Sequence, residues 1–296
     1  MTSGNGFYRK KISMLDIMNV IGMLLICFIT IYPIWYIIVN SLTGTDESLI
    51  ANVNWWPKSF SLDNYVAVFK NSGILKGFGI SIARTLIATT LHVFFTAMVA
   101  YGLSKKYLVG RKIYMTIGLI TMLFSGGLIP AFLLIKNLGM YDKFTVFIIP
   151  AMFSFYNLIL FISFFKSLPE SLEESAKIDG ANEFSIFLKI VIPCSKAAFA
   201  TIALFAGVYH WNDYFVGVIY IDNENLRPIQ TILYKIVSEN AALYIQQDSL
   251  GVMGKRISPD SIKFATMVIA TFPIICVYPF LQRFFVKGMM IGSIKG

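Results

Sequence analysis

The residues of this chain whose types suit chemistry gather in one short run. From position 209 to 214 the run reads YHWNDY, and apolar residues flank it on both sides. Flat aromatic faces beside hydrogen-bonding groups suit sugar rings and their hydroxyls, so one interpretation is a pathway for a polar solute. The lining residues would be Tyr209, Trp211, Asn212, Asp213 and Tyr214. The alternative is that these groups form hydrogen bonds between helices and hold a bundle together, and the sequence leaves both open.

Few ionisable residues lie inside the apolar runs of the chain. Arg84 lies near one end of its run, where its long side chain is expected to reach the membrane surface. Asp213 lies deeper, and an isolated carboxylate costs on the order of 2.5–3.5 kcal/mol at the centre of a membrane helix. His92 and His210 occupy different runs and have no set of carboxylates around them. We therefore expect both histidines to pack or to form hydrogen bonds rather than to catalyse.

The sequence lacks the short motifs that carry enzyme chemistry. It has no GxxxxGK(S/T) loop for ATP phosphates, no HExxH zinc motif and no GxSxG elbow. The three cysteines, Cys27, Cys194 and Cys276, lie far apart, which argues against a disulfide framework or a metal site. We therefore expect a non-catalytic protein with no metal or cofactor of its own.

Composition places the chain in a membrane. Of its 296 residues, 56% are hydrophobic and only 14% are charged, and the mean hydropathy is +0.69. A soluble domain is closer to about 25% charged. The net charge of +9 does not indicate nucleic acid, because the basic residues flank apolar runs and form no single polar surface. The expected fold class is an all-α integral membrane protein.

Six apolar segments are long enough to cross a membrane, which takes about 20 residues. Several contain proline or paired glycines, which a bundle of neighbouring helices tolerates. The predicted spans are 17–39, 80–103, 113–135, 144–165, 197–220 and 264–286. They make up a transmembrane domain over 15–286, which includes a hydrophilic loop at 167–194 and is flanked by tails at 1–14 and 287–296.

The distribution of Lys and Arg predicts the orientation. These residues favour the N-terminal tail, the loops after the second and fourth spans and the C-terminal end, once the long loop 221–263 is given less weight. Both termini and the 167–194 loop are therefore expected in the cytoplasm. The long loops 42–77 and 221–263 are then expected outside, where they either contact another protein or simply cap the bundle.

The 167–194 loop is a structured polar insert between two apolar runs. Leu172 and Ala176 lie four residues apart, and Asp179-Gly180 interrupts that pattern. Apolar residues then return at helical spacing until Pro193, which is expected to end the second helix. This second stripe consists of Phe184, Phe187, Leu188 and Val191. The segment predicts two short helices around a glycine turn, in the form of an amphipathic docking hairpin.

The hairpin resembles the cytoplasmic loop of ATP-binding-cassette (ABC) importer permeases. The family pattern runs EAA, a short spacer, Gly and, further on, a hydrophobic-Pro end. It stands here as Glu174-Ser175-Ala176, Gly180 and Ile192-Pro193, with Ser175 replacing the usual alanine by another small residue. The continuation Asp179-Gly180-Ala181 is typical of the carbohydrate branch.

Further motifs resemble the same family, in order, along nearly the whole chain. They are Tyr32-Pro33, Asn40-Ser41-Leu42, Leu62-Asp63-Asn64-Tyr65, Ala100-Tyr101-Gly102-Leu103-Ser104, Trp211-Asn212-Asp213-Tyr214, Lys287-Gly288 and Gly292-Ser293-Ile294-Lys295-Gly296. The run FSGGLIP at 124–130 is similar to the subgroup that imports complex saccharides, including pectin- or uronate-derived oligosaccharides. The chain thus resembles a carbohydrate permease of the maltose type, of the inner-membrane G-like kind.

This resemblance implies the type I importer permease fold, with six transmembrane helices and both termini inside. It implies three kinds of protein partner: a second permease subunit, two cytosolic ATPases that bind ATP and magnesium, and an extracellular solute-binding protein. It also implies contact with membrane lipid. The substrate would be an oligosaccharide, moved into the bacterial cytoplasm through the plasma membrane by alternating access. Nucleic acid is not among the implied partners.

The resemblance also assigns the hairpin to ATPase coupling. That role would fall to Glu174, Ser175, Ala176, Asp179, Gly180, Ala181, Phe187 and Pro193, with Lys287–Gly296 as a second contact. The alternatives are an ABC permease for a different solute and an ATP-independent carrier. A proton- or sodium-coupled carrier normally needs more intramembrane carboxylates than Asp213 alone. A membrane-embedded enzyme would need a convergent set of acid, base or metal ligands, which the sequence lacks.

Overall fold

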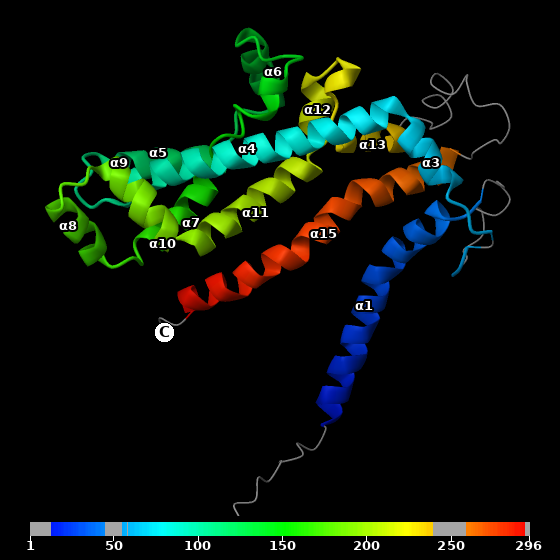
Figure 1. Cartoon of the computed structure of the whole chain (residues 1–296), viewed down its shortest axis with the longest axis horizontal. Helices are drawn as coiled ribbons and strands as arrows, with labels where there is room; N and C mark the ends of the chain where they lie inside the picture. The colour runs from blue at the N-terminus through cyan, green and yellow to red at the C-terminus, as the bar shows by residue number, and fades with distance from the viewer. Residues whose placement is uncertain (1–12, 45–54, 58, 239–258, 294–296) are drawn as a thin grey trace, which may run out of the picture. The chain divides into compact units, whose positions relative to one another are not determined.

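The computed structural model describes residues 13–44, 55–57, 59–238 and 259–293, which are mostly helical (Figure 1). The helices belong to two compact units. The first holds the described residues up to Val68 and those at 259–268, and the second holds the described residues at 69–238 and 269–293. The helical prediction from composition and apolar runs is therefore confirmed for the described ranges.

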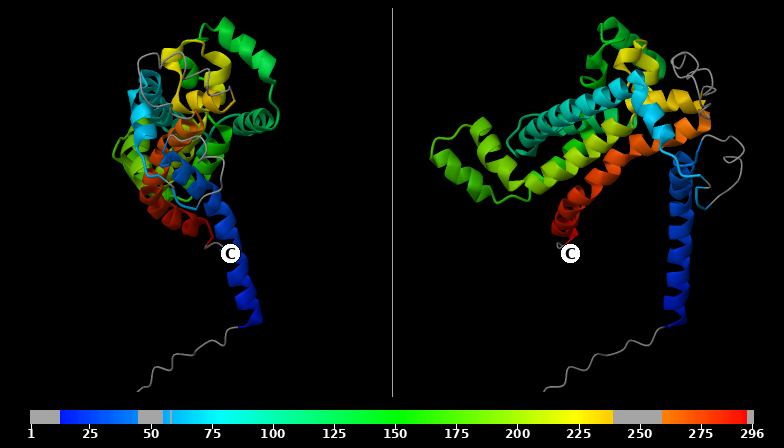
Figure 2. Two further views of the ribbon diagram at one scale, coloured as in Figure 1. Left: turned by 90° about the vertical axis from the view of Figure 1, so that its right-hand side faces the viewer. Right: turned by 45° about the vertical axis from the view of Figure 1, so that its right-hand side comes forward.

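The first unit is built on α1 (Met14–Ser41), with most of α3 (Asp63–Lys70) and the start of α15 (Pro259–Ser293). Ser13 caps α1 in a capping box with Asp16. The buried side chain of Asn64 donates hydrogen bonds to the Ser41 and Thr43 carbonyls, at 3.0 and 2.9 Å, and thereby ties α3 to the end of α1. In this unit α1 runs as one long helix (Figure 2). Most of its apolar side chains are exposed, which suits a helix that contacts lipid.

The second unit is organised around α4 (Ser72–Ser104), which lies alongside α11 (Lys196–Asn212) and α7 (Phe155–Phe165) (Figure 1). The other helical elements of this unit are α5 (Arg111–Leu123), α6 (Leu128–Asn137), the 3-10 turn η1 (Phe144–Phe147), α8 (Glu170–Ile178), α9 (Glu183–Ile186), the π-helical η2 (Phe187–Val191), α10 (Ile192–Cys194), α12 (Phe215–Tyr220), the 3-10 turn η3 (Glu224–Leu226), α13 (Ile229–Ser238) and the rest of α15.

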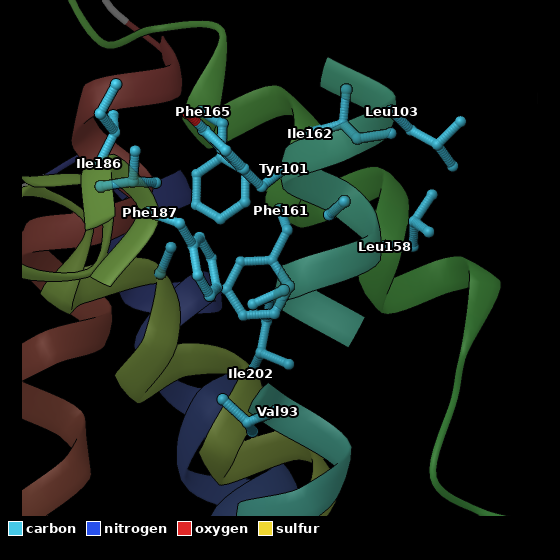
Figure 3. Packing of buried hydrophobic residues seen from close by; sticks show 14 of the residues in the cluster. Val93, Tyr101, Leu103, Leu158, Phe161, Ile162, Phe165, Ile186, Phe187 and Ile202 are labelled. Carbon is cyan, nitrogen blue, oxygen red and sulfur yellow. The ribbon is translucent and has the colours of Figure 1, made fainter. Parts of the chain in front are cut away.

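Aromatic side chains fill the space between α4, α7, α11 and η2 (Figure 3). The ring centroids of Phe161 and Phe199 are 4.9 Å apart, and those of Tyr101 and Phe187 are 5.4 Å apart. Phe161 and Phe187 are almost completely buried. Burying a side chain of this size contributes about 1.5–3 kcal/mol, so this cluster holds η2 firmly against the bundle.

Two helices in the described part of the chain, α1 and α4, are each long and apolar enough to cross a membrane. The number rises to four if two bent pairs of helices each count as one span. One bent pair is α5 with α6, whose axes turn by 113°, and the other joins the helical stretch 183–194 to α11 at 84°.

The predicted span 113–135 is therefore not one straight helix, because glycine interrupts it. Phe124 ends α5 in an extended conformation, and Gly127 has φ +86°, which is in the left-handed region that side chains avoid. Pro130 then lies in the first turn of α6, where its missing N–H is no loss. The paired glycines thus act as a corner between two helices.

Two other predicted spans are also interrupted. In 144–165 only α7 is α-helical, and the turn η1 and irregular backbone around Pro150 come before it. In 197–220 α11 ends at Asn212, and α12 begins at Phe215 after a break. At the C-terminal end α15 continues as helix to Ser293, so residues 287–293 of the predicted tail are helical. The proposed second contact at Lys287–Gly296 lies partly outside the described residues, and its side chains are not described.

Candidate functional site

The first arm of the predicted hairpin is α8, and Gly180 turns the chain at its end. Gly180 has φ +79°. Its N–H bonds to the Lys177 carbonyl at 3.0 Å, and the Ala181 N–H bonds to the Ala176 carbonyl at 2.9 Å. These two bonds form a Schellman motif, which satisfies carbonyls that a helix end leaves free. The predicted glycine turn is confirmed, and its requirement for glycine comes from the backbone because a Cβ there would meet nothing within 4 Å.

The second arm starts at Asn182, whose side chain accepts a hydrogen bond from the Ser185 N–H at 2.8 Å. The arm continues from α9 through η2 to Cys194, directly after Pro193, so the predicted end is confirmed. Within η2 the Ile192 N–H reaches back to the Phe187 carbonyl, five residues earlier. Because Pro193 has no N–H, the turn before it lacks one α-helical bond, and the π geometry accommodates this loss.

The predicted apolar stripe of the second arm is wrong in part. Phe187 and Val191 are buried, but Phe184 and Leu188 are exposed, and Ile186 is buried in their place. The segment has more apolar residues than one helix face can hold. The face that meets the bundle is the one with Ile186 and Phe187, which the spacing alone does not identify.

The residues predicted to contact an ATPase divide between the surface and the core. Exposed members are Glu174, Ser175, Asp179, Gly180 and Pro193; Ala176 and Phe187 are buried and Ala181 is half-buried. Apolar side chains lie open beside the exposed members, and Ile178 is 86% exposed. Leu172 and Phe184 are also exposed on this hairpin. An exposed apolar surface rimmed by polar groups is typical of a protein-binding site.

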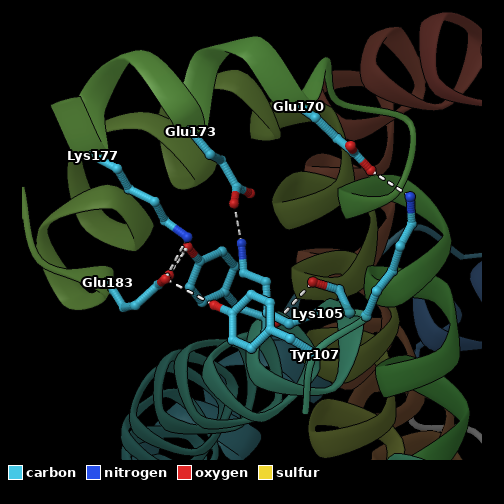
Figure 4. A network of polar contacts seen from close by, with 9 residues as sticks. Lys105, Tyr107, Glu170, Glu173, Lys177 and Glu183 are labelled. Atoms are coloured by element: carbon cyan, nitrogen blue, oxygen red, sulfur yellow. Dashed lines mark hydrogen bonds and ion pairs between the residues drawn. The ribbon is translucent and has the colours of Figure 1, made fainter.

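Charged and phenolic side chains connect the hairpin to the end of α4 (Figure 4). Lys105, just after α4, pairs with Glu173 of α8 and lies 3.9 Å above the ring of Tyr101. Lys106 pairs with Glu170 at 2.7 Å, but both side chains are largely exposed. These are opposite charges on two loops that the Lys and Arg distribution placed on the same side. Opposite charges on two loops of the same side are the sequence signal that points to this contact.

Glu183, at the start of α9, accepts the largest number of contacts in this network (Figure 4). Its Oε2 accepts from the Tyr101 hydroxyl at 2.7 Å, and its Oε1 accepts from Tyr107 and Lys177, both at 2.8 Å. Partial burial alone would raise the pKa of Glu183, but these three donors outweigh it and lower the pKa to about 2. The same contact raises the pKa of Lys177. The carboxylate is therefore ionised at any physiological pH.

The polar run 209–214 lies at the break between α11 and α12, not inside a continuous helix. Asp213 is extended, and its Oδ1 accepts from the N–H groups of Phe215 and Val216, which caps α12. Its Oδ2 pairs with Arg84 of α4, whose guanidinium also donates to the Asp213 carbonyl at 2.9 Å. Arg84 is only 1% exposed, so the expectation that it reaches the membrane surface is wrong. A buried countercharge stabilises it in place of water.

The other residues of the run have different surroundings. Trp211 is buried, and its indole N–H donates to the Ala270 carbonyl at 2.9 Å. Asn212 donates to the Val208 carbonyl of its own helix, at 3.0 Å. Tyr209 and Tyr214 are exposed, and Tyr214 stacks on Tyr234 with centroids 4.7 Å apart. Trp211 therefore fits the alternative in which this run forms hydrogen bonds between helices, whereas the exposed rings of the two tyrosines are accessible to a solute.

A cavity of about 560 Å³ opens beside this break. Arg84, His92, Tyr209 and His210 line it, together with Asn157. His92 Nδ1 is 2.7 Å from the Ala151 carbonyl and its Nε2 is 2.8 Å from Asn157, which confirms the expected hydrogen bonding for this histidine. The buried Nδ1 of His210 has no partner in the described structure. The cavity thus combines aromatic walls with hydrogen-bonding groups.

The hairpin and the α11–α12 break both lie in a part of the chain that matches a known protein family. Residues 93–291 match the family described as binding-protein-dependent transport system inner membrane component. The chain belongs to this family. The match includes the C-terminal part of α4 from Val93, the whole hairpin and the α11–α12 break. The chain is thus a non-catalytic membrane permease of an ABC importer, in a bacterial inner membrane.

Individual proteins are similar to this chain over nearly its whole length. The polygalacturonan/rhamnogalacturonan transport system permease protein YtcP of Bacillus subtilis (strain 168) is 40% identical over 276 residues, which cover 93% of this permease and 96% of YtcP. Protein LplC of the same organism is 40% identical over 282 residues, or 95% of each chain.

A solved structure shows the fold. One chain from the crystal structure of a bacterial ABC transporter involved in the import of the acidic polysaccharide alginate matches this permease with a TM-score of 0.84 and 28% identity. The match covers 94% of this permease and 99% of that chain. The fold is therefore that of a type I ABC importer permease.

Proposed function

We propose that this permease moves an acidic oligosaccharide, pectin- or uronate-derived, into the cytoplasm by alternating access. It works with a second permease subunit, two cytosolic ATPases and an extracellular solute-binding protein. The chain crosses the membrane six times with both termini inside, so the hairpin faces the ATPases. An acidic substrate is supported by YtcP, named for polygalacturonan and rhamnogalacturonan, and by the transporter described as importing alginate.

The observation that carries the proposal is the contrast between the two sides of the hairpin. One side is embedded in the bundle through Ile186 and Phe187, and the other side presents Leu172, Ile178 and Phe184 to solvent. A hairpin of this kind transmits a push from a docked protein into the helices behind it. This arrangement supports the coupling role of the hairpin residues Glu174, Ser175, Ala176, Asp179, Gly180, Ala181, Phe187 and Pro193.

The substrate pathway is proposed to run past the α11–α12 break. Tyr209 and Tyr214 offer exposed aromatic faces there and Asn212 offers an exposed amide, while Asp213, paired with Arg84, holds the break in position beside them. The adjoining cavity of about 560 Å³ has room for part of an oligosaccharide. Trp211 serves this pathway through packing, because it is buried against α15.

Purification of the tagged permease from its source membranes tests the assembly. We expect an ABC ATPase and a second permease to co-elute, and the reconstituted complex with its binding protein to take up galacturonate oligosaccharides when ATP is present. Uptake of only neutral oligosaccharides would contradict the acidic substrate. A homo-oligomer that transports without ATP would contradict the importer assignment and favour a carrier.

Replacing Tyr209 and Trp211 separately tests the pathway. Tyr209→Ala should lower uptake while the complex still assembles, because the Tyr209 ring is 59% exposed. Trp211→Ala should lower the thermal stability of the complex, because it removes a buried ring and the bond to Ala270. Full uptake by Tyr209→Ala would remove this residue from the pathway.

A further inference from the structure

The outer helix of the hairpin is attached to the bundle mainly through charge. Ala176 is the only buried residue of α8, and its side chain is a single methyl group. In contrast, the second arm buries Ile186, Phe187 and Val191. Apolar burial therefore fixes the second arm but contributes little to holding α8.

Three ion pairs supply the missing attachment, and they are not equivalent (Figure 4). Lys106–Glu170 is a surface pair, with side chains 85% and 74% exposed, and such pairs contribute little. Lys105–Glu173 is better shielded. Lys177–Glu183 joins α8 to α9, and the same carboxylate also binds the end of α4 through Tyr101.

Tyr101 makes the Glu183 contact stiff. Its ring is buried between the rings of Phe187, 5.4 Å away, and Phe165, 6.4 Å away. Its hydroxyl therefore has a fixed position from which it donates to Glu183. A hydrogen bond to an ionised carboxylate is roughly twice as strong as one between neutral groups, and the lowered pKa of Glu183 shows that its charged form is the one held here.

We infer that Glu183 is a positioning residue for coupling, which locks the exposed helix α8 to the cytoplasmic end of α4 through Lys177, Tyr101 and Tyr107. The inference rests on the proposed function, because coupling requires an ATPase docked on the hairpin. A push on α8 passes through Glu183 to Tyr101 and so to α4. Without the carboxylate, α8 keeps its docking surface but moves against the bundle, so the displacement is absorbed.

The test compares Glu183→Gln with Glu170→Gln in the assembled complex. Both changes remove one carboxylate from an ion pair of the same network, but only the Glu183 carboxylate accepts a hydrogen bond from Tyr101. We expect both variants to assemble and to hydrolyse ATP. The amount of substrate imported per ATP should fall about tenfold in Glu183→Gln, the effect of losing one hydrogen bond to a charged group, and should stay unchanged in Glu170→Gln. Tyr101→Phe removes only the hydroxyl and should reproduce the loss.

Amide hydrogen exchange gives a readout that does not depend on transport. The α8 amides should exchange faster in Glu183→Gln and Tyr101→Phe than in wild type or Glu170→Gln, while the α7 amides stay equally protected. The double variant Tyr101→Phe with Glu183→Gln should be no worse than Glu183→Gln alone, because the Tyr101 hydroxyl acts only through the Glu183 carboxylate.

The outcomes separate the inference from the proposed function. If the wild-type complex couples transport to ATP and Glu183→Gln matches Glu170→Gln in both readouts, the positioning role is wrong and the importer assignment stands. If the wild-type complex transports without ATP, the proposed function fails, and unchanged exchange of α8 in Glu183→Gln would then also reject the lock.

Discussion

At the scale of single residues, Gly180 is a position where backbone geometry alone sets the residue type. Its φ of +79° costs a side chain about 1–2 kcal/mol, although a Cβ would have free space. Gly180→Ala should therefore loosen the end of α8, and Gly180→Asn should do so less because asparagine tolerates this region. Amide exchange of the Ala176–Ala181 turn measures the effect.

A glycine of the opposite kind provides the control. Gly102 lies inside α4, and a Cβ there also meets nothing within 4 Å. Gly102→Ala should leave exchange unchanged or slower, because alanine favours a helix interior. Equal behaviour of the two alanine variants would show that the left-handed turn does not hold the hairpin.

The charge state of Glu183 makes the lock insensitive to physiological pH. The pKa of this carboxyl is about 2 in the folded protein, below the ordinary value of about 4.3. A lowered pKa contributes stability that is complete above the ordinary value and is lost as the pH falls through the folded one. After correction for intrinsic rates, α8 protection should therefore be constant from about pH 5 to 8. A decline within that window would assign the lock to another titrating group.

Sequence reasoning recovered the residues whose role is local and missed those whose partner is distant. Gly180 and Pro193 act within their own turns, so the pattern identified both. Glu183 depends on Tyr101 and Tyr107, which lie in another loop. Spacing alone predicts Arg84 at the surface, because it does not reveal the buried ion pair with Asp213.

At the scale of elements, the Arg84–Asp213 pair connects α4 to the α11–α12 break. Removing one member of a buried pair leaves the other charge uncompensated and typically costs about 3–5 kcal/mol. Arg84→Met should therefore strongly destabilise the permease in detergent, as measured by thermal unfolding. Adding Asp213→Asn should recover part of the loss, because the amide oxygen can still cap α12. The exposed Lys106→Met is the control and should unfold like wild type. Strictly additive losses would mean that the two side chains do not act as a pair.

The positions of apolar helices followed from the sequence, but their interruptions did not. A window of apolar residues predicts that 113–135 and 197–220 are membrane-sized, and both contain helices. The breaks at Gly126-Gly127 and Asp213 depend on local backbone conformation and on a buried partner from α4, which an average over the window cannot detect. The break at Asp213 falls beside polar groups and a cavity, as expected of a broken helix that lines a pathway.

At the scale of the whole molecule, the second unit carries two distinct sites on one helix. Arg84 is about 25 Å from Tyr101 along α4, from the helical rise of 1.5 Å per residue. The C-terminal end of α4 therefore meets the hairpin network, and a position nearer its middle meets the α11–α12 break. A displacement of the hairpin that α4 transmits as a rigid rod changes both sites together.

Labelling of single cysteines from each side of the membrane tests the proposed orientation. In a background without Cys27, Cys194 and Cys276, we expect Val109→Cys to react with a membrane-impermeant maleimide only in inverted vesicles. This position is 89% exposed in the loop between α4 and α5. Asn225→Cys, in the exposed turn η3, should react only in intact cells, because the basic residues favour the opposite side. Swapped labelling would place the hairpin outside, where no ATP-driven subunit can reach it, and would overturn both the orientation and the coupling role of the hairpin.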